Sequence, residues 1–171
     1  MTDEALMICI KNDDLGKVAS LYEHYKKRLL QYFAYRSFND REASKDLVQQ
    51  VFLRVIEYRK SFKDEGNFKV WLYAIAANVN RREVKYQMQR KDSISAYSEE
   101  HSYVMENDDY KAIYQILKKM PEQYSEVLMM SKFWGMKYEE IATLKVCSVG
   151  VIKTRVYRAM QLLKESYFKL N

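Results

Sequence analysis

Residues 137–164, KYEEIATLKVCSVGVIKTRVYRAMQLLK, constrain the fold of this chain more than any other stretch. Their hydrophobic spacing predicts two helices joined by a tight corner. In the first helix, Tyr138, Ile141 and Ala142 fall at i, i+3 and i+4 and give one apolar face. After the corner, Ser148 is placed to cap the second helix with its hydroxyl. The stretch therefore predicts a helix-turn-helix.

The second of these helices carries two separate stripes. The apolar stripe, which we expect to be buried, steps by four, three and four residues and consists of Ile152, Val156, Ala159 and Leu163. The other stripe combines methyl, hydroxyl and guanidinium groups, which can reach base edges and phosphates in a DNA major groove. It consists of Val151, Thr154, Arg155 and Arg158, with Lys153 beside it. An ordinary helical hairpin with a solvated basic face is the alternative interpretation, because basic helix faces are common.

The rest of the chain favours an all-α fold. Only four Gly and one Pro occur in 171 residues, which argues against a sheet-and-turn architecture and for helices with short corners. We expect no membrane span and no signal peptide, because no apolar run reaches about 18 residues and the N-terminus carries acids. The chain is therefore predicted to be cytoplasmic.

No residue pattern predicts a cofactor, a metal or an enzymatic activity. Cys9 and Cys147 lie far apart and belong to no CxxC, so reduced packing cysteines are expected. His24 and His101 are isolated, and no phosphate-cradling glycine motif occurs.

Charge divides the chain into three parts. Residues 1–91 hold 18 Lys and Arg against 12 Asp and Glu, and residues 110–171 hold 11 against five, so each part has a net charge of +6. Residues 92–109 hold six acids and no Lys or Arg, are without helical period, and have a net charge of −6. We therefore predict two polyanion-facing domains, 1–91 and 110–171, joined by an acidic linker at 92–109.

Helical periodicity predicts the elements of the first domain. Helices are expected over 5–16, 18–35, within 38–62 with a cap at Asn39 or Asp40, and over 68–89, with a loop at 61–68 around Gly66. The last of these helices has a polar stripe of Asn78, Arg81, Arg82 and Lys85. That stripe follows a loop region bearing Phe62, Lys63, Phe68 and Lys69, and aromatic and basic groups together can hold unstacked bases and their phosphates. A solvated surface is the alternative.

In the second domain, the helical spacing of apolar residues begins again at Tyr110 and continues through Ile113 to Met120, which predicts a helix. Pro121 is expected in the first turn of the next helix, which Gly135 should end before the helix-turn-helix.

Three stretches in this order resemble the extracytoplasmic-function (ECF) sigma factors of the sigma-70 family. DLVQQVFLRV at 46–55 and FKVWLYAIAANVNRREVK at 68–85 are similar to the family's region 2. PEQYSEVLMMSKFWGMKYEEIA with SVGVIKTRVYRA, at 121–142 and 148–159, is similar to its region 4. The resemblance covers the chain from about Leu21 to Leu163. It implies an all-α protein with two small domains, which binds core RNA polymerase and directs it to promoters without catalysing a reaction.

The resemblance also implies roles for individual residues. The residues that would contact core polymerase are Asp46, Gln49, Gln50, Phe52 and Arg54. The loop at 61–68 would hold a base flipped from the melted minus-ten element, with the strand on the polar stripe of 78–85. The residues that would lie in the major groove of the minus-thirty-five duplex are Ser148, Val149, Gly150, Val151, Lys153, Thr154, Arg155 and Arg158. The acidic linker would run near the RNA exit path of the polymerase.

Three positions depart from the family pattern. Val146 stands where the corner usually has Gly or Asn, so a strained backbone or a different turn is expected. Lys145 replaces an apolar residue, and Val151 replaces a common Thr, which should change the bases that are read.

The resemblance implies further partners, and two other functions compete with it. Such factors commonly have an anti-sigma partner, often membrane-bound, and the free chain is expected to be a monomer. One alternative is a stand-alone helix-turn-helix regulator that binds a palindrome without polymerase. The other is an adaptor whose basic faces only keep it in solution.

Overall fold

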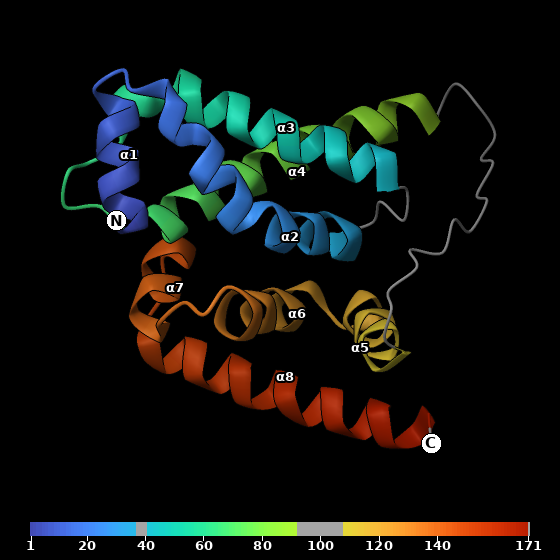
Figure 1. The fold of residues 1–171 in the computed structure, drawn as a ribbon. Helices are drawn as coiled ribbons and strands as arrows, with labels where there is room; N and C mark the ends of the chain where they lie inside the picture. The colour runs from blue at the N-terminus through green and yellow to red at the C-terminus, as the bar shows by residue number, and fades with distance from the viewer. Residues whose placement is uncertain (37–40, 92–107, 171) are drawn as a thin grey trace. The chain divides into compact units, whose positions relative to one another are not determined.

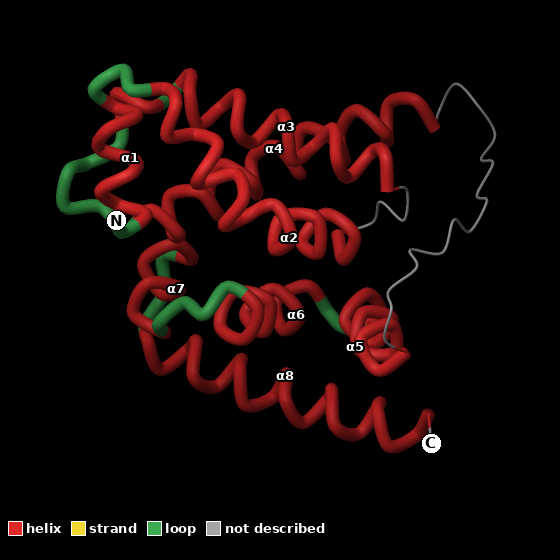
Figure 2. Tube along the Cα trace, viewed as in Figure 1, coloured by secondary structure: helices red, strands yellow, loops and turns green. Residues whose placement is uncertain are grey.

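The computed structural model describes residues 1–36, 41–91 and 108–170, and these ranges contain helices and no strand (Figures 1 and 2). The chain divides into two compact units, Met1–Tyr103 and Val104–Asn171, called unit 1 and unit 2 below. The all-α, two-domain prediction is confirmed. The expected linker at 92–109 lies almost wholly outside the described residues, as does the expected cap at Asn39 or Asp40.

Unit 1 is built from four α-helices and two short 3-10 turns among its described residues. The helices are α1 (Asp3–Lys11), α2 (Val18–Arg36), α3 (Arg41–Glu57) and α4 (Phe68–Lys91), and the turns are η1 (Leu15–Lys17) and η2 (Arg59–Ser61). Helix α3 packs between α2 and α4, and α1 packs on α2. The apolar stripes expected from the sequence form the core, in which the side chains of Leu21, Leu29, Val51, Val55, Leu72 and Ala76 are fully buried.

Helix α1 is shorter than the sequence predicted and begins earlier. Thr2 caps it by accepting a hydrogen bond from the backbone N–H of Ala5 at 3.2 Å. It ends at Lys11 because the chain turns at Asp13, whose φ of 73° cannot continue a right-handed helix. The backbone turn at Asp13 therefore ends the helix, five residues before the predicted end at Gly16.

Unit 2 contains α5 (Asp108–Lys119), α6 (Glu122–Leu128), α7 (Tyr138–Lys145) and α8 (Val149–Leu170). Helices α5, α6 and α7 all pack on α8, around the fully buried side chains of Leu117, Leu128, Trp134, Ile141, Ile152 and Ala159. Pro121 precedes α6 in an extended conformation, with ψ 136°, instead of lying in its first turn. Its carbonyl accepts from the N–H groups of Tyr124 and Ser125, so it serves as the N-cap and the predicted position was wrong by one residue.

A wide π-helical turn, η3 (Met129–Phe133), continues α6. Its diagnostic hydrogen bond runs from the N–H of Trp134 to the carbonyl of Met129 at 3.0 Å, five residues back. Gly135 follows with a φ of 62° and ends the helix, as predicted.

The corner between α7 and α8 shows how a valine replaces the expected Gly or Asn. Val146 lies in the left-handed region, with φ 54° and ψ 49°, which costs a residue with a Cβ roughly 1–2 kcal/mol. The chain thus keeps the usual turn and accepts strain. The following cap is as predicted, since the Ser148 hydroxyl accepts from the N–H of Val151 at 3.2 Å. Lys145, the other departure, is half-buried and forms an ion pair with Glu126 of α6.

Candidate nucleic-acid and protein interfaces

The outward face of α3 carries most of the residues expected to contact polymerase. Asp46, Gln49 and Gln50 are exposed, and the half-buried Arg54 pairs with Glu57 one turn later. These side chains recur at helical spacing and share one side of the helix.

Phe52 does not belong to this face. Its side chain is only 5% exposed, and its ring packs edge-on against Tyr22 of α2 with centroids 5.2 Å apart. The structure therefore places Phe52 between α2 and α3, where it can support the face but cannot contact a partner directly.

Sequence reasoning missed Leu53, which is 64% exposed on the same face. It stands three residues after Gln50 and four after Gln49, outside the apolar stripe of α3. This spacing could have predicted its exposure from the sequence, because a leucine on the polar side of an amphipathic helix does not face the core. Its exposed side chain can contribute buried apolar area if a partner covers this face.

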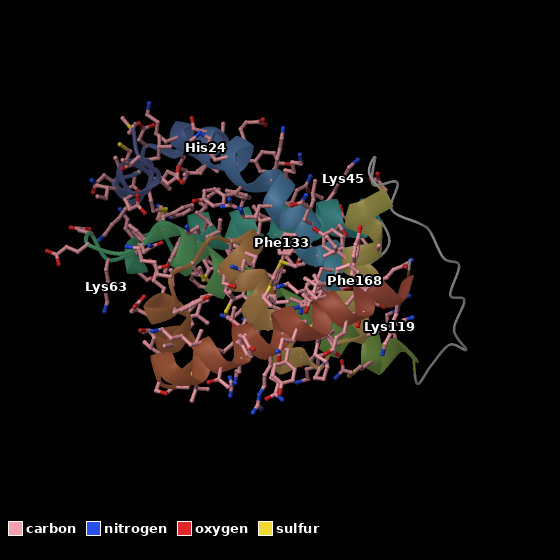
Figure 3. The ribbon with its side chains drawn as sticks, turned by 90° about the horizontal axis from the view of Figure 1, so that it is seen from below. His24, Lys45, Lys63, Lys119, Phe133 and Phe168 are labelled. Atoms are coloured by element: carbon pink, nitrogen blue, oxygen red, sulfur yellow. The ribbon has the colours of Figure 1, made fainter. Side chains whose placement is uncertain are left out.

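The loop between α3 and α4, residues 62–67, was expected to present aromatic rings to a base, and it does not. Phe62 and Phe68 are 1% and 0% exposed, and their centroids lie 6.3 Å apart under the loop. They form part of the core because η2 and the start of α4 converge over them. The exposed side chains are Lys63, Asp64, Glu65 and Asn67. Figure 3 shows Lys63 on this loop, directed away from the helices.

Tight local contacts hold the shape of this loop. The N–H of Gly66 donates to the carbonyl of Lys63 at 2.8 Å, and a Cβ at Gly66 would lie only 2.8 Å from that same oxygen. A side chain at position 66 would therefore force the turn open. The side chain of Asn67 then caps α4 by accepting from the N–H of Val70 at 3.1 Å.

A pocket of about 230 Å³ between α3 and α4 presents aromatic surface to the solvent. It brings Arg54 of α3 together with Asn78 and Arg82 of α4, which the sequence assigned to two different partners. The full lining is Arg54, Tyr58, Ser61, Trp71, Ala74, Ile75, Asn78, Val79 and Arg82. Two aromatic residues here, Tyr58 and Trp71, were missed. Helical spacing could have found Trp71, because it lies seven and eleven residues before Asn78 and Arg82.

The other predicted residues of α4 extend this basic surface. The guanidinium of Arg81 donates to the side-chain oxygen of Asn78 at 2.6 Å, which fixes the orientation of that amide. Arg81, Arg82 and Lys85 are exposed, and Lys69 in the first turn is half-buried. The surface can bind a polyanion that runs along α4.

On unit 2, the second stripe of α8 faces outward as expected. Val151, Lys153, Thr154 and Arg158 are exposed, and Val149 and Arg155 are half-buried. The Thr154 hydroxyl donates to the carbonyl of Gly150 at 3.0 Å, leaving its methyl group and oxygen at the surface. A helix with this face can enter a major groove.

Tyr157 was missed on this helix. It is 64% exposed, three residues after Thr154 and next to Arg158. Its hydroxyl accepts a hydrogen bond from the amide of Gln161 at 3.0 Å. The signal was available in the sequence, because position 157 falls outside the buried stripe.

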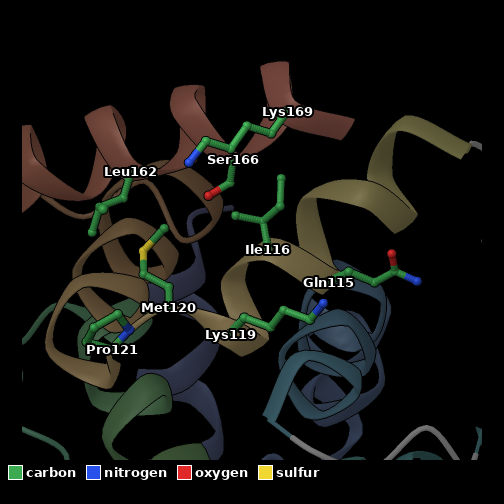
Figure 4. Close-up of a pocket in the computed structure, with 8 residues that line it drawn as sticks. All are labelled: Gln115, Ile116, Lys119, Met120, Pro121, Leu162, Ser166 and Lys169. Atoms are coloured by element: carbon green, nitrogen blue, oxygen red, sulfur yellow. The ribbon is translucent and has the colours of Figure 1, made fainter. Parts of the chain in front are cut away.

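Unit 2 also has a groove of about 300 Å³, and none of the residues predicted to contact DNA or polymerase lines it. Figure 4 shows Ile116, Met120 and Leu162 converging on it, with Lys119 and Lys169 at its edges. It lies between α5, the start of α6 and the second half of α8, away from the helix-turn-helix corner.

Within the described ranges, no cluster of His, Cys, Asp or Glu is arranged to hold a metal, and no helix is long and apolar enough to cross a membrane. Cys9 and Cys147 are both free thiols.

Comparison with known proteins identifies the family of this chain. A sigma-70 region 2 model matches residues 21–90, and a sigma-70 region 4 model matches residues 110–163. The chain belongs to the sigma-70 family of RNA polymerase sigma factors, in its ECF group. Members of this family are initiation factors rather than enzymes.

Similar proteins come from Bacillus subtilis and Haemophilus influenzae. The RNA polymerase sigma factor YlaC of Bacillus subtilis is 29% identical over 89% of this chain and 92% of its own length. The ECF RNA polymerase sigma-E factor of Haemophilus influenzae is 23% identical over 96% and 94% of the two chains.

Two solved structures share the fold. CnrH, in complex with the cytosolic domain of CnrY, is 20% identical and matches 95% of each chain with a TM-score of 0.69. The sigma factor RpoE of Bartonella quintana, in complex with the anti-sigma factor NepR, is 23% identical with a TM-score of 0.62, covering 86% of this chain and 96% of that one.

Proposed function

We propose that this protein binds core RNA polymerase through unit 1 and directs it to promoters by reading the minus-ten element with unit 1 and the minus-thirty-five element with unit 2. The observation that carries the proposal is the coexistence, on one chain of this family, of an amide-rich helix face, a basic aromatic pocket and a helix-turn-helix with an exposed reading face. We further propose that it acts in the cytoplasm.

The polymerase contact is assigned to the exposed face of α3. Gln49, Gln50 and Leu53 form its centre, with Asp46 and Arg54 at the sides. An exposed leucine surrounded by hydrogen-bonding amides supports a protein partner rather than DNA, since the leucine would gain little from a phosphate backbone. Phe52 supports this face from beneath.

The melted minus-ten strand is assigned to the pocket between α3 and α4. Tyr58 and Trp71 supply rings on which an unstacked base can lie, and Asn78 supplies an amide for its edge. Arg81, Arg82 and Lys85 follow along α4 and can bind the phosphates of the same strand. This assignment moves base contact from Phe62 and Phe68 to the pocket that adjoins them. Lys63 and Lys69 remain candidates for phosphate contacts.

The minus-thirty-five duplex is assigned to α8. Val151, Thr154 and Tyr157 present apolar and hydroxyl groups for base edges, while Lys153, Arg155 and Arg158 can bind phosphates or guanine. Ser148, Val149 and Gly150 form the helix N-terminus, which can approach the backbone. The proposed acidic linker at 92–109 carries six acids and no Lys or Arg, and would be repelled by DNA between the two contacts.

An anti-sigma factor is the proposed regulatory partner. A structurally similar sigma factor has been solved in complex with one. A partner that covers the exposed face of α3 would compete with polymerase for this chain.

Polymerase capture and promoter-specific transcription test the proposal together. Immobilised chain is incubated with bacterial core polymerase, and the same mixture is tested for transcripts from genomic fragments of the host. We expect a variant with Gln50→Ala, Leu53→Ala and Arg54→Ala to lose at least about tenfold in capture, which requires the three side chains together to contribute about 1.4 kcal/mol of binding free energy.

The matched control carries Arg82→Ala and Lys85→Ala on α4. It should capture core polymerase normally but give fewer transcripts, because it removes only DNA contacts. The proposal fails if the unmodified chain captures no core polymerase or adds no promoter-specific transcript to core alone. Tight binding of the free chain to a palindrome would instead support the stand-alone regulator.

A further inference from the structure

Helix α1 makes polar contacts with both ends of the 62–67 loop. The ammonium of Lys11 donates to the backbone carbonyl of Phe62 at 2.8 Å and to the carboxylate of Asp64 at 2.6 Å. At the other end, Glu4 accepts from the N–H of Phe68 at 3.2 Å. One helix at the start of the chain thus fixes the entry and the exit of a loop some fifty to sixty residues later.

The turn after α1 adds a second set of contacts just before the loop. Asp13 accepts hydrogen bonds from Arg59 and Lys60 of η2, both at 2.9 Å. Lys60 also donates to the backbone carbonyl of Lys11 at 2.6 Å. The bond from Lys60, followed by that from Arg59, lowers the pKa of Asp13, so its carboxylate stays charged and paired at neutral pH.

Helix α1 is itself anchored on α2. The Tyr25 hydroxyl donates to Asp3 at 2.6 Å, and the ring of Tyr25 packs edge-on against Phe68 at 5.4 Å. Burial, together with the bond to Asp3, raises the pKa of Tyr25, so the phenol remains a donor. The helix is therefore a fixed point for the loop rather than an independent arm.

The first residue of the loop, Phe62, connects α1 to the candidate base pocket. The ring of Phe62, directly beside the carbonyl that Lys11 holds, packs edge-on against Trp71 with centroids 5.3 Å apart. Trp71 lines the pocket with Tyr58 and Asn78. Two contacts, the hydrogen bond from Lys11 to Phe62 and the ring contact between Phe62 and Trp71, therefore connect the ammonium of Lys11 to an aromatic wall of that pocket.

We propose that α1 is a brace that pre-positions this wall for the melted strand, with Lys11 as its positioning residue. The inference rests on the proposed function, because it gives the brace a role in reading the minus-ten element. Residues 3–11 lie before residue 21, where the region 2 match begins, so the match to the family does not assign them this role. A positioned aromatic surface binds a base without first having to be ordered, and a displacement of about 1 Å in such a surface can cost up to about a hundredfold in rate.

The test measures promoter opening by holoenzyme that contains Lys11→Met. Methionine keeps a flexible, unbranched side chain of similar length but removes the charge and both hydrogen bonds. We expect opening, followed by permanganate reactivity of unpaired thymines, to slow by about tenfold or more. Core capture, binding of a minus-thirty-five duplex and the melting temperature should stay near those of the unmodified chain. Lys11→Arg, which can donate to both oxygens, should restore most of the opening rate.

Lys26→Met is the matched control. Lys26 also forms a 2.6 Å ion pair, with Glu23 on the same helix, and its ammonium lies over the ring of Tyr22. Its replacement therefore removes a comparable ion pair but keeps the hydrogen bonds from α1 to the loop. The proposal is overturned if Lys11→Met opens promoters like Lys26→Met. It is also overturned if core capture, duplex binding and melting temperature fall with opening, since Lys11 would then only stabilise the fold. Failure of the unmodified chain to direct transcription would reject the proposed function itself and would be seen before any variant is compared.

Discussion

Val146 shows that a single residue can keep a turn by tolerating strain. Its side chain is 90% exposed, so no packing compensates for the left-handed backbone. The turn survives because the N–H groups after α7 are satisfied, with that of Cys147 donating to the carbonyl of Ala142 at 3.1 Å. The strain therefore lowers the stability of unit 2, and a residue that tolerates this backbone conformation should relieve it.

Replacing Val146 should stabilise the protein. Asparagine tolerates the left-handed region, so we expect Val146→Asn to raise the free energy of unfolding by about 1 kcal/mol. Scanning calorimetry of the full chain would measure the change. Val151→Asn, at an exposed helical position, is the control and should be neutral or slightly destabilising. A Val146→Asn chain no more stable than the parent would contradict the strain at this corner.

Single residues also show why some site predictions failed. Spacing in the sequence identified which side of α4 is polar, but it could not show that Phe62 and Phe68 turn under the loop. Their burial depends on α1, which lies more than fifty residues away in sequence. Leu53, Tyr58 and Trp71 were within reach of spacing arguments, but their exposure is set by the packing of neighbouring helices.

At the scale of the element, long periodic helices were the most predictable feature. Helices α2 and α4 begin at the predicted residues and end within two residues of the predicted ends, because each carries an apolar stripe over many turns. Short elements depended on individual hydrogen bonds instead. The end of α1 at the Asp13 turn and the π-helical turn at 129–133 left no periodic signal.

Helix α8 combines a buried face with the proposed reading face, and mutations should affect the two separately. Ile152 is fully buried, whereas Val151 beside it is 39% exposed. We expect Ile152→Ala to lower the free energy of unfolding by about 2–4 kcal/mol, because it leaves a cavity in the core of unit 2.

Val151→Ala, by contrast, should change stability by less than about 0.5 kcal/mol. It should instead alter which minus-thirty-five sequences the holoenzyme prefers, since the valine methyl groups would no longer reach a thymine methyl. Thermal unfolding and a selection from randomised duplexes would measure the two effects. Equal loss of stability in both variants would contradict the division of α8 into two faces.

At the scale of the whole molecule, positive charge is divided between the two parts of the chain to which the proposed function assigns DNA contacts. Each basic part of the chain has a net charge of +6, and the part between them has a net charge of −6. The ordering of these parts along the sequence was predictable from composition and motif alone. The pairing of Arg54 with α4 in one pocket was not, because it arises only when α3 and α4 pack.

Binding of the free chain to a minus-thirty-five duplex should be weak and strongly dependent on salt. We expect Lys153→Ala to reduce the slope of log affinity against log salt by about 1, the value for one lost phosphate contact. Fluorescence anisotropy of a labelled duplex would measure it. Lys164→Ala, further along α8 and outside the proposed reading face, is the control and should leave the slope unchanged.

The two tryptophans of the chain fall one in each unit, Trp71 in α4 and Trp134 after the π-helical turn. Trp71 is partly exposed in the candidate base pocket, while Trp134 is 1% exposed in the interior of unit 2. Each unit therefore contains its own intrinsic fluorophore. With Trp134→Phe, emission should report the arrival of a base if the pocket in unit 1 binds one as proposed. With Trp71→Phe, it should report the unfolding of unit 2, so the two units can be observed separately without a label.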